Sequence, residues 1–243
     1  MQRLSNSTLS MLRGDHACRR CFYDHVKLKI ERPRGAFPSI PGGIDREVKL
    51  YADEYRGRMP PLLGEPTSGL GRPPSGAKLW GTEAEIKKLR HWASGLKAQV
   101  DGFEIIGAFD DLVVHPEGTF SPLDFKSRGA EPEEHDARWY QSQVDIYALL
   151  LDRNGMQPSG HGYLWYWFPR AGPSEQPVAF GTSVIVMSAD WERAVELIVE
   201  AKAVLTYDRP PLGKTCEWCL YRGAMPAPPC SETPGPVIVP GAA

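Results

Sequence analysis

The sequence predicts an α/β fold in which a mixed central β-sheet is flanked by helices, with the N- and C-terminal segments joined by a cysteine metal cluster. Two observations predict this class. Helical periodicity in the first third of the chain gives way to two strands, a helix, two strands and a final helix. A C-x-x-C pair also lies near each end of the chain. A mixed sheet covered by helices is the economical way to bury the apolar faces of these elements.

Three helices are predicted before the first strand, over residues 5–17, 43–56 and 82–94. Thr82 immediately precedes the third helix, and Glu85 follows three residues later. This spacing is typical of a capping box, in which the two side chains satisfy backbone N–H groups of the first turn.

Strand patterns begin at residue 103 and alternate with helical ones to the end of the domain. Strands over 103–114 and 119–126, joined by a turn at 115–118, form a predicted hairpin. The later elements are a helix over 132–152, strands over 162–168 and 180–187, and a helix that Asp190 caps and that ends near Leu205.

The composition is that of an ordinary globular chain with 243 residues, 42% of them hydrophobic and 24% charged. We expect a single domain over residues 1–225 with an internal Pro/Gly loop at 57–81, and a disordered Pro-rich tail at 226–243. No stretch approaches the roughly 18 apolar residues of a membrane span, and the start lacks a signal-peptide core, so we expect a cytoplasmic protein with no membrane contact. The net charge of −2 excludes a bulk basic coat for nucleic acid but leaves room for a local basic groove.

Asp124 and Lys126 are two residues apart on a predicted strand, so both project from one face of the sheet. Pairing that is symmetric about Glu117 in the hairpin turn places Asp110 directly across from Asp124. Side chains opposed in this way have Cβ atoms about 5 Å apart, and two carboxylates at that distance repel each other unless a cation lies between them.

A divalent ion such as Mg²⁺ suits this pair, because it binds one or two carboxylates and leaves other positions to water and substrate phosphate. Lys126 could then orient the attacking water or neutralise charge that develops on the phosphate. On the next helix, Gln143 and Tyr147 are four residues apart and share one face. The alternative is that these aspartates only decorate an exposed hairpin, beside a solvated glutamine and a core tyrosine.

Three motifs together resemble the PD-(D/E)XK nuclease superfamily and, within it, the RecB-like exonucleases that include CRISPR-associated iron-sulfur nucleases. The motifs are Gly107-Ala-Phe-Asp110, Leu123-Asp124-Phe125-Lys126 and Gln143-Val-Asp-Ile-Tyr147, and the opening Leu4 to Tyr23 is also similar. The resemblance implies a restriction-endonuclease-like core and a DNA exonuclease that uses Mg²⁺ or Mn²⁺ on a single-stranded end. It implies catalytic roles for Asp110, Asp124, Lys126, Gln143 and Tyr147, with Asp110, Asp124 and Asp45 as metal ligands. This sequence departs from the family at Asp45, where histidine or glutamate is usual, and at Arg19, where proline is usual.

The cysteines form two C-x-x-C pairs, Cys18 with Cys21 and Cys216 with Cys219, and Cys230 follows in the tail. Disulfides are not expected in the cytoplasm, and four thiolates suit either tetrahedral Zn²⁺ or an iron-sulfur cluster. The resemblance implies a 4Fe-4S cluster, with zinc as the alternative. It also allows Cys230 in place of Cys21, although the prolines before Cys230 favour the two symmetric pairs.

Basic and aromatic side chains supply candidates for contact with DNA. The basic ones are Arg19, Arg20, Lys27, Lys29, Arg32, Arg34, Lys87, Lys88 and Arg90, and the aromatic ones are Trp80, Trp92 and Trp139. Together with these candidates, the resemblance implies a DNA exonuclease acting in repair, recombination, phage replication or CRISPR adaptation. Its rivals are a non-catalytic nucleic-acid-binding or adaptor protein that keeps the fold, and a zinc-stapled structural protein.

Overall fold

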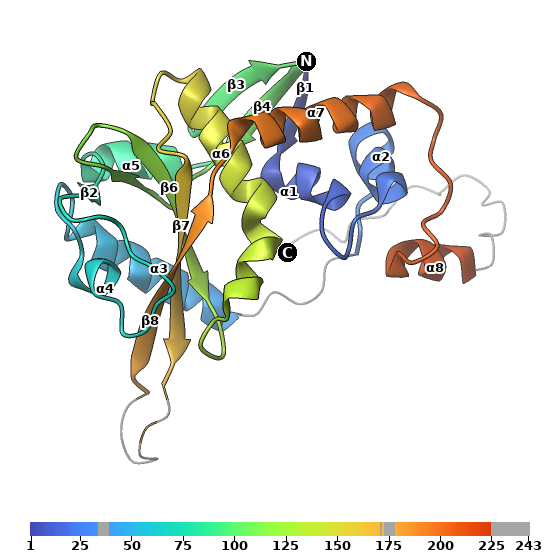
Figure 1. The fold of residues 1–243 in the computed structure, drawn as a ribbon. Helices are drawn as coiled ribbons and strands as arrows, with labels where there is room; N and C mark the ends of the chain where they lie inside the picture. Colours follow the sequence, from blue (N-terminus) through green and yellow to red (C-terminus); the bar gives the residue numbers. More distant parts are fainter. Residues whose placement is uncertain (34–38, 171, 173–177, 225–243) are drawn as a thin grey trace, which may run out of the picture.

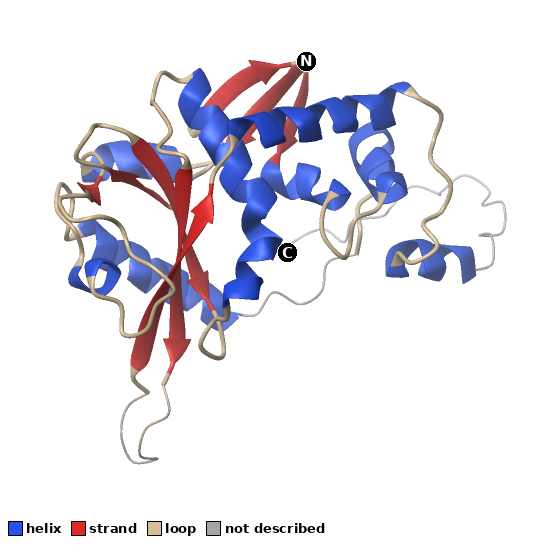
Figure 2. Ribbon diagram, in the orientation of Figure 1, coloured by secondary structure: helices blue, strands red, loops and turns tan. Residues whose placement is uncertain are grey.

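The computed structural model describes residues 1–33, 39–170, 172 and 178–224, and it confirms the mixed α/β class (Figures 1 and 2). Two sheets are present in this part of the chain, one of three strands and one of five. The smaller sheet has the order β1-β4-β3, with β1 Gln2–Ser5, β4 Phe103–Gly107 and β3 Leu96–Val100. β1 runs parallel to β4, and β3 runs antiparallel to it.

The larger sheet carries the predicted hairpin and has the order β2-β5-β6-β7-β8. Its strands are β2 Lys78–Leu79, β5 Asp111–Val114, β6 Phe120–Ser127, β7 His161–Pro169 and β8 Phe180–Ser188. β6 and β7 are parallel, and the chain between them forms the crossover helix α6 Gln141–Arg153. The other neighbouring strands pair in antiparallel fashion.

Helix α6 is the centre of the molecule. It packs against strands of both sheets and against α7 Trp191–Thr206, and its residues from Val144 to Leu151 are all buried (Figure 1). A helix enclosed on all sides has a fixed rotation, so the side chains that it presents to β6 are held in place.

The remaining helices cover the outer surfaces. They are α1 Asn6–Leu9, α2 Arg19–Leu28, α3 Ser39–Asp53, α4 Pro61–Gly64, α5 Glu83–Arg90 and α8 Glu217–Ala224, with 3₁₀ turns at Ser10–Leu12 and Glu134–Tyr140. No helix among the described residues is both long enough and apolar enough to span a membrane.

The two faces of β6 differ as the sequence predicts. Leu123 and Phe125 pack in a core that includes Val48 and Ala52 of α3. Asp124 and Lys126 point the other way and meet Gln143 of α6. The strand therefore separates an apolar layer under α3 from a polar layer under α6.

Several local expectations are confirmed. Thr82 and Glu85 form the capping box of α5, and Asp190 caps α7 through the backbone N–H of Glu192. The hairpin turn closes where expected, with Gly118 donating its N–H to the carbonyl of His115 at 2.9 Å.

Other expectations are wrong. The single strand over 103–114 is divided into β4 and β5, which belong to different sheets. At the division, a Cβ on Gly107 would lie 2.5 Å from Leu150 of α6, so the chain passes too close to the helix for a side chain. In place of the helix over 5–17, the structure has two short helical turns over residues 6–12 that follow strand β1, and the helix over 132–152 begins as a 3₁₀ helix.

Four further elements had no expectation: β1, β3, α2 and α8. The predicted loop 57–81 contains α4 and β2. The tail 226–243, with Cys230, lies outside the described residues, as does Arg34.

Candidate active site and metal centre

The hairpin register brings the first two candidate carboxylates together on adjacent elements. β5 pairs Asp111 with Leu123, which is the predicted register, and Asp110 lies in the bend just before β5. The Asp110 side chain crosses to β6, where its Oδ2 accepts a hydrogen bond from the backbone N–H of Phe125 at 3.0 Å. Asp110 therefore reaches the strand that carries Asp124 through its side chain, from outside the strand ladder.

Asp124 lies at the centre of the polar layer and is only 3% exposed. Its Oδ1 accepts a hydrogen bond from Gln143 Nε2 at 2.5 Å, and its Oδ2 forms an ion pair with Lys126. Burial, together with the negative charge of Asp110, raises the pKa of Asp124 to about 6 against the lowering effects of Lys126 and Gln143. A nearby cation would stabilise the ionised form of this buried carboxylate.

Lys126 is fixed from three sides. Besides the Asp124 ion pair, its Nζ lies 3.4 Å from Gln143 Oε1 and 4.2 Å from the ring centroid of Tyr140. Because the ammonium is held beside the carboxylates by a hydrogen bond and a cation–π contact, it presents a positive charge at a defined place.

Gln143 and Tyr147 are one turn apart on α6 and act as a pair. Gln143 Nε2 lies 3.1 Å from the Tyr147 hydroxyl, which donates to the carbonyl of Ala108 at 2.7 Å. The Tyr147 ring stacks on Phe109 with centroids 4.1 Å apart. Burial raises the pKa of Tyr147, so the hydroxyl stays protonated and holds the segment that leads into Asp110.

Asp45 of α3 joins this group through a residue that the sequence reasoning missed. Lys49 Nζ lies 2.8 Å from Asp45 Oδ2 and 2.9 Å from Asp110 Oδ1. Burial lowers the pKa of Lys49, but the charges of Asp110 and Asp45 outweigh it and raise the pKa overall. The i, i+4 spacing of Asp45 and Lys49 could have indicated their pairing, whereas nothing local in the sequence links Lys49 to Asp110.

Asp111, the neighbour of Asp110, has a different environment. It is fully buried, and its carboxylate forms ion pairs with Arg56 and Arg90. Arg90 also contacts Asp53 at 2.8 Å and the carbonyl of Asp110 at 2.7 Å. Arg90, a candidate for DNA contact, is thus half-buried and held in ion pairs with Asp53 and Asp111.

The donor chemistry at Asp110 and Asp124 fits a hard divalent cation. Such an ion takes oxygen ligands, commonly one or two carboxylates completed by water and substrate phosphate. Asp124, whose pKa is raised by burial and by the charge of Asp110, lies beside a fixed lysine and matches that requirement.

Other DNA-contact candidates are divided between ion pairs and exposed positions. Arg19 pairs with Glu200 and Arg20 with Asp24, while Lys87 pairs with Glu83. Of the three candidate tryptophans, Trp92 is 62% exposed and Trp139 is 42% exposed. Trp80 packs against the main hydrophobic core.

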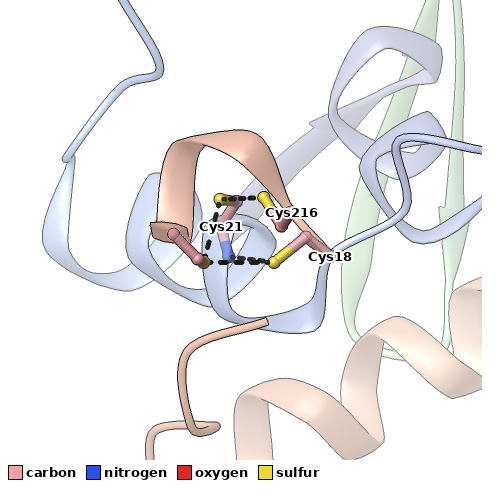
Figure 3. Close-up of side chains that lie close together, drawn as sticks. Cys18, Cys21 and Cys216 are labelled. Carbon is pink, nitrogen blue, oxygen red and sulfur yellow. Dashed lines mark hydrogen bonds between the residues drawn. The ribbon is translucent and has the colours of Figure 1, made fainter. Parts of the chain in front are cut away.

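The four paired cysteines form a second centre, built from the two ends of the described chain (Figure 3). Cys18 caps α2 and Cys21 lies in its first turn, whereas Cys216 precedes α8 and Cys219 lies within it. All four are buried, and their sulfur atoms lie within 4.8 Å of one another. The two symmetric pairs predicted from the spacing therefore meet.

Neighbouring groups stabilise negative charge at this centre. The backbone N–H of Cys21 donates to Cys18 Sγ at 3.5 Å, and Arg32 Nη2 lies 4.0 Å from Cys216 Sγ. Burial alone would raise the pKa of Cys216, but hydrogen bonds from the Cys219 backbone and the other thiols lower it to about 7. At least one thiol therefore loses its proton easily, as metal binding requires.

Buried Asp24 reinforces the same junction. Three arginines from separate segments surround its carboxylate: Arg20 of α2 at 3.1 Å, Arg209 at 2.8 Å and Arg222 of α8 at 2.6 Å. The ion pairs and the cysteines together attach α8 to α2.

Comparison with known proteins agrees with this geometry. The model of the PD-(D/E)XK nuclease superfamily matches residues 63–224, a span that contains Asp110, Asp124, Lys126, Gln143 and Tyr147. The chain belongs to the PD-(D/E)XK nuclease superfamily. The match begins after Cys18, Cys21 and Asp45, so it carries no information on those residues.

Among solved structures, the chain is similar to the crystal structure of SSO0001. The two are 14% identical, with 93% of this chain and 87% of the other covered and a TM-score of 0.41. No curated protein matches the sequence.

Proposed function

We propose that this member of the superfamily is a DNA exonuclease that hydrolyses phosphodiester bonds with Mg²⁺ or Mn²⁺ bound at Asp110 and Asp124. The observation that supports it most is the convergence of those carboxylates with Lys126 and Gln143 under one buried helix. Membership of the superfamily indicates a metal-dependent nuclease with a nucleic-acid substrate.

In this proposal, Asp110 and Asp124 supply the ligand oxygens, and Asp45 is the candidate third carboxylate. A bound Mg²⁺ or Mn²⁺ would supply Lewis-acid stabilisation of the phosphoryl oxygens and a water of lowered pKa. Lys126, held over Tyr140, neutralises negative charge as it develops or orients the attacking water.

Gln143 and Tyr147 serve as positioning residues. Gln143 fixes Asp124 and Lys126 through the two ends of one amide, and Tyr147 fixes the backbone before Asp110. Catalytic groups act most efficiently when they are held in the productive geometry before the reaction begins. The buried helix α6 would hold Gln143 and Tyr147 in this way.

The finer parts of the proposal come from the family resemblance. They are exonuclease rather than endonuclease action, preference for a single-stranded end, a cytoplasmic setting, and a role in repair, recombination, phage replication or CRISPR adaptation. The resemblance also implies a 4Fe-4S cluster at the cysteine centre, with zinc as the alternative. Either the cluster or zinc would have a structural role there, because the four cysteine ligands leave no coordination position open for substrate.

A non-catalytic nucleic-acid-binding protein is the second candidate, and one observation favours it. Asp45 and Asp110 both contact Lys49, so the third carboxylate is joined to the site through a lysine. A protein of this kind would bind DNA without cutting it.

The test uses end-labelled linear DNA and covalently closed circular DNA, each incubated with the purified full chain in Mg²⁺, Mn²⁺ or EDTA. An exonuclease degrades linear DNA only when metal is present and spares the circle, and Asp124→Ala abolishes the activity. Cutting of the circle would replace exonuclease with endonuclease action. DNA binding with no cutting in either metal would establish the adaptor function.

A further inference from the structure

The cysteine centre carries an inference about its metal, independent of whether the protein cuts DNA. We propose that Cys18, Cys21, Cys216 and Cys219 hold a single tetrahedral zinc ion. This differs from the four-iron cluster that the family resemblance implies.

The separations of the sulfur atoms support a single ion. Cys18 Sγ lies 3.6 Å from Cys219 Sγ, Cys21 Sγ lies 3.6 Å from Cys216 Sγ, and Cys21 Sγ lies 3.9 Å from Cys219 Sγ. Four sulfurs that surround one zinc ion at about 2.3 Å form a tetrahedron with edges of about 3.8 Å. The three observed separations, 3.6, 3.6 and 3.9 Å, are close to that edge length, and each joins a sulfur of the N-terminal pair to one of the C-terminal pair.

A four-iron cluster needs a wider cage. Each of its four thiolates binds a different iron, so the iron-sulfide core separates the cysteine sulfurs more widely than one ion does. Here no sulfur of the four is more than 4.8 Å from another. The space that the four sulfurs enclose is therefore of the size of one ion.

The backbone at Gly213 approaches the sulfur atoms closely on one side of the site. A Cβ built on Gly213 would lie 3.1 Å from Cys18 Sγ and 3.0 Å from the Cβ of Cys216, so Gly213 packs directly against the sulfurs. Cys21 and Cys219 are each only 1% exposed, so they have no open side toward solvent.

The arrangement of the ligands also fits a structural zinc site. Such sites are closed, with four protein ligands and no position for water or substrate. Each C-x-x-C pair here is associated with the start of a helix, and Arg32 beside Cys216 offsets part of the negative charge of four thiolates on a divalent ion.

The experiment measures the metal content of the full chain, expressed in medium supplied with both iron and zinc and purified without oxygen. The expected result is a colourless protein with about one zinc per chain, and without acid-labile sulfide or absorbance near 400 nm. X-ray absorption at the zinc edge should show sulfur neighbours alone at about 2.3 Å. Brown protein with stoichiometric iron and sulfide would overturn the proposal, as would metal-free protein in which all five cysteines titrate as free thiols.

Two variants assign the zinc to these ligands. Cys230→Ser is the matched control and should keep the zinc content of the wild type, whereas Cys216→Ser should lose it. If Cys216→Ser is insoluble, release of zinc from wild-type protein by a mercurial reagent, followed with a zinc indicator, gives the ligand count in its place. Zinc retention by Cys216→Ser, or zinc loss in Cys230→Ser, would contradict the assignment. Because the readout is metal content, failure here leaves the nuclease proposal standing, and a lack of nuclease activity leaves this inference standing.

Discussion

The carboxylate centre and the cysteine centre contrast in how the chain builds them. Asp110, Asp124 and Gln143 lie on consecutive elements, and the hairpin register and the crossover helix bring them together. Cys18 and Cys219 lie near the two ends of the described chain and meet through tertiary packing. The carboxylate centre contains buried Asp124, whose ionised form is disfavoured by burial. The cysteine centre brings together two segments that are distant in the sequence. The carboxylate centre is therefore placed by local structure, whereas the cysteine centre is placed by contact between distant segments.

The largest expected effect is on the long-range closure. Cys216→Ser should cost on the order of several kcal/mol of unfolding free energy or prevent soluble expression, because metal binding at this site is coupled to folding. Thermal unfolding and limited proteolysis measure it, with Cys230→Ser as the control. A Cys216→Ser protein as stable and protease-resistant as the wild type would show that the cysteines do not hold the two ends together.

The adjacent residues Asp110 and Asp111 are expected to have different roles, metal binding for Asp110 and stability for Asp111. Asp111→Asn should destabilise the protein by on the order of a few kcal/mol, because Arg56 and Arg90 lose one ion-pair partner and keep Asp53. Asp110→Asn should weaken Mn²⁺ binding measured by calorimetry and change stability much less. The reverse pattern would mean that Asp111, and not Asp110, faces the metal.

A smaller effect is expected at the positioning residue. Gln143→Ala should lower metal affinity or activity by about 10–100-fold, the usual cost of removing a group that orients a ligand. Gln143→Glu is the matched variant, because it keeps an oxygen for Lys126 but cannot donate to Asp124. Full activity in Gln143→Ala, measured under single-turnover conditions, would remove Gln143 from the site.

The smallest effect concerns pH and the metal-free protein. The pKa of Asp124 is raised from 3.8 to about 6 on folding, so the folded state binds the extra proton between these values and stability falls as pH rises through that window. Asp124→Asn cannot ionise, so in EDTA it should melt at a higher temperature than wild type at pH 8 and at a similar temperature at pH 4. A lower melting temperature for Asp124→Asn at pH 8 would show that the ionised carboxylate stabilises the fold.

Much of the carboxylate centre could be predicted because its determinants are local. Strand alternation places Asp124 and Lys126 on one face, the turn sets the pairing toward Asp110, and helical spacing places Gln143 with Tyr147. The spacing of the cysteines likewise predicts a four-sulfur cluster, and the four side chains do meet.

The rest depends on contacts that leave no local trace. β1 is four residues long and pairs with β4 about one hundred residues later, so no nearby pattern marks it as a strand. The segment 103–114 has uninterrupted strand character, and only the approach of α6 at Gly107 divides it. The contact of Lys49 with Asp110, and of Arg56 with Asp111, joins helix α3 and the turn after it to a distant hairpin.

The most direct test of the account compares wild type with Lys126→Ala in one experiment that follows Mn²⁺ binding, DNA binding and DNA hydrolysis. The account predicts that the variant binds Mn²⁺ and DNA nearly as well as wild type but cuts at least about a thousandfold more slowly, because it keeps the ligand oxygens and loses the charge that acts on the phosphate. Equal rates of hydrolysis in the two proteins, once contaminating nuclease has been excluded, would contradict the assignment of the chemistry to this centre.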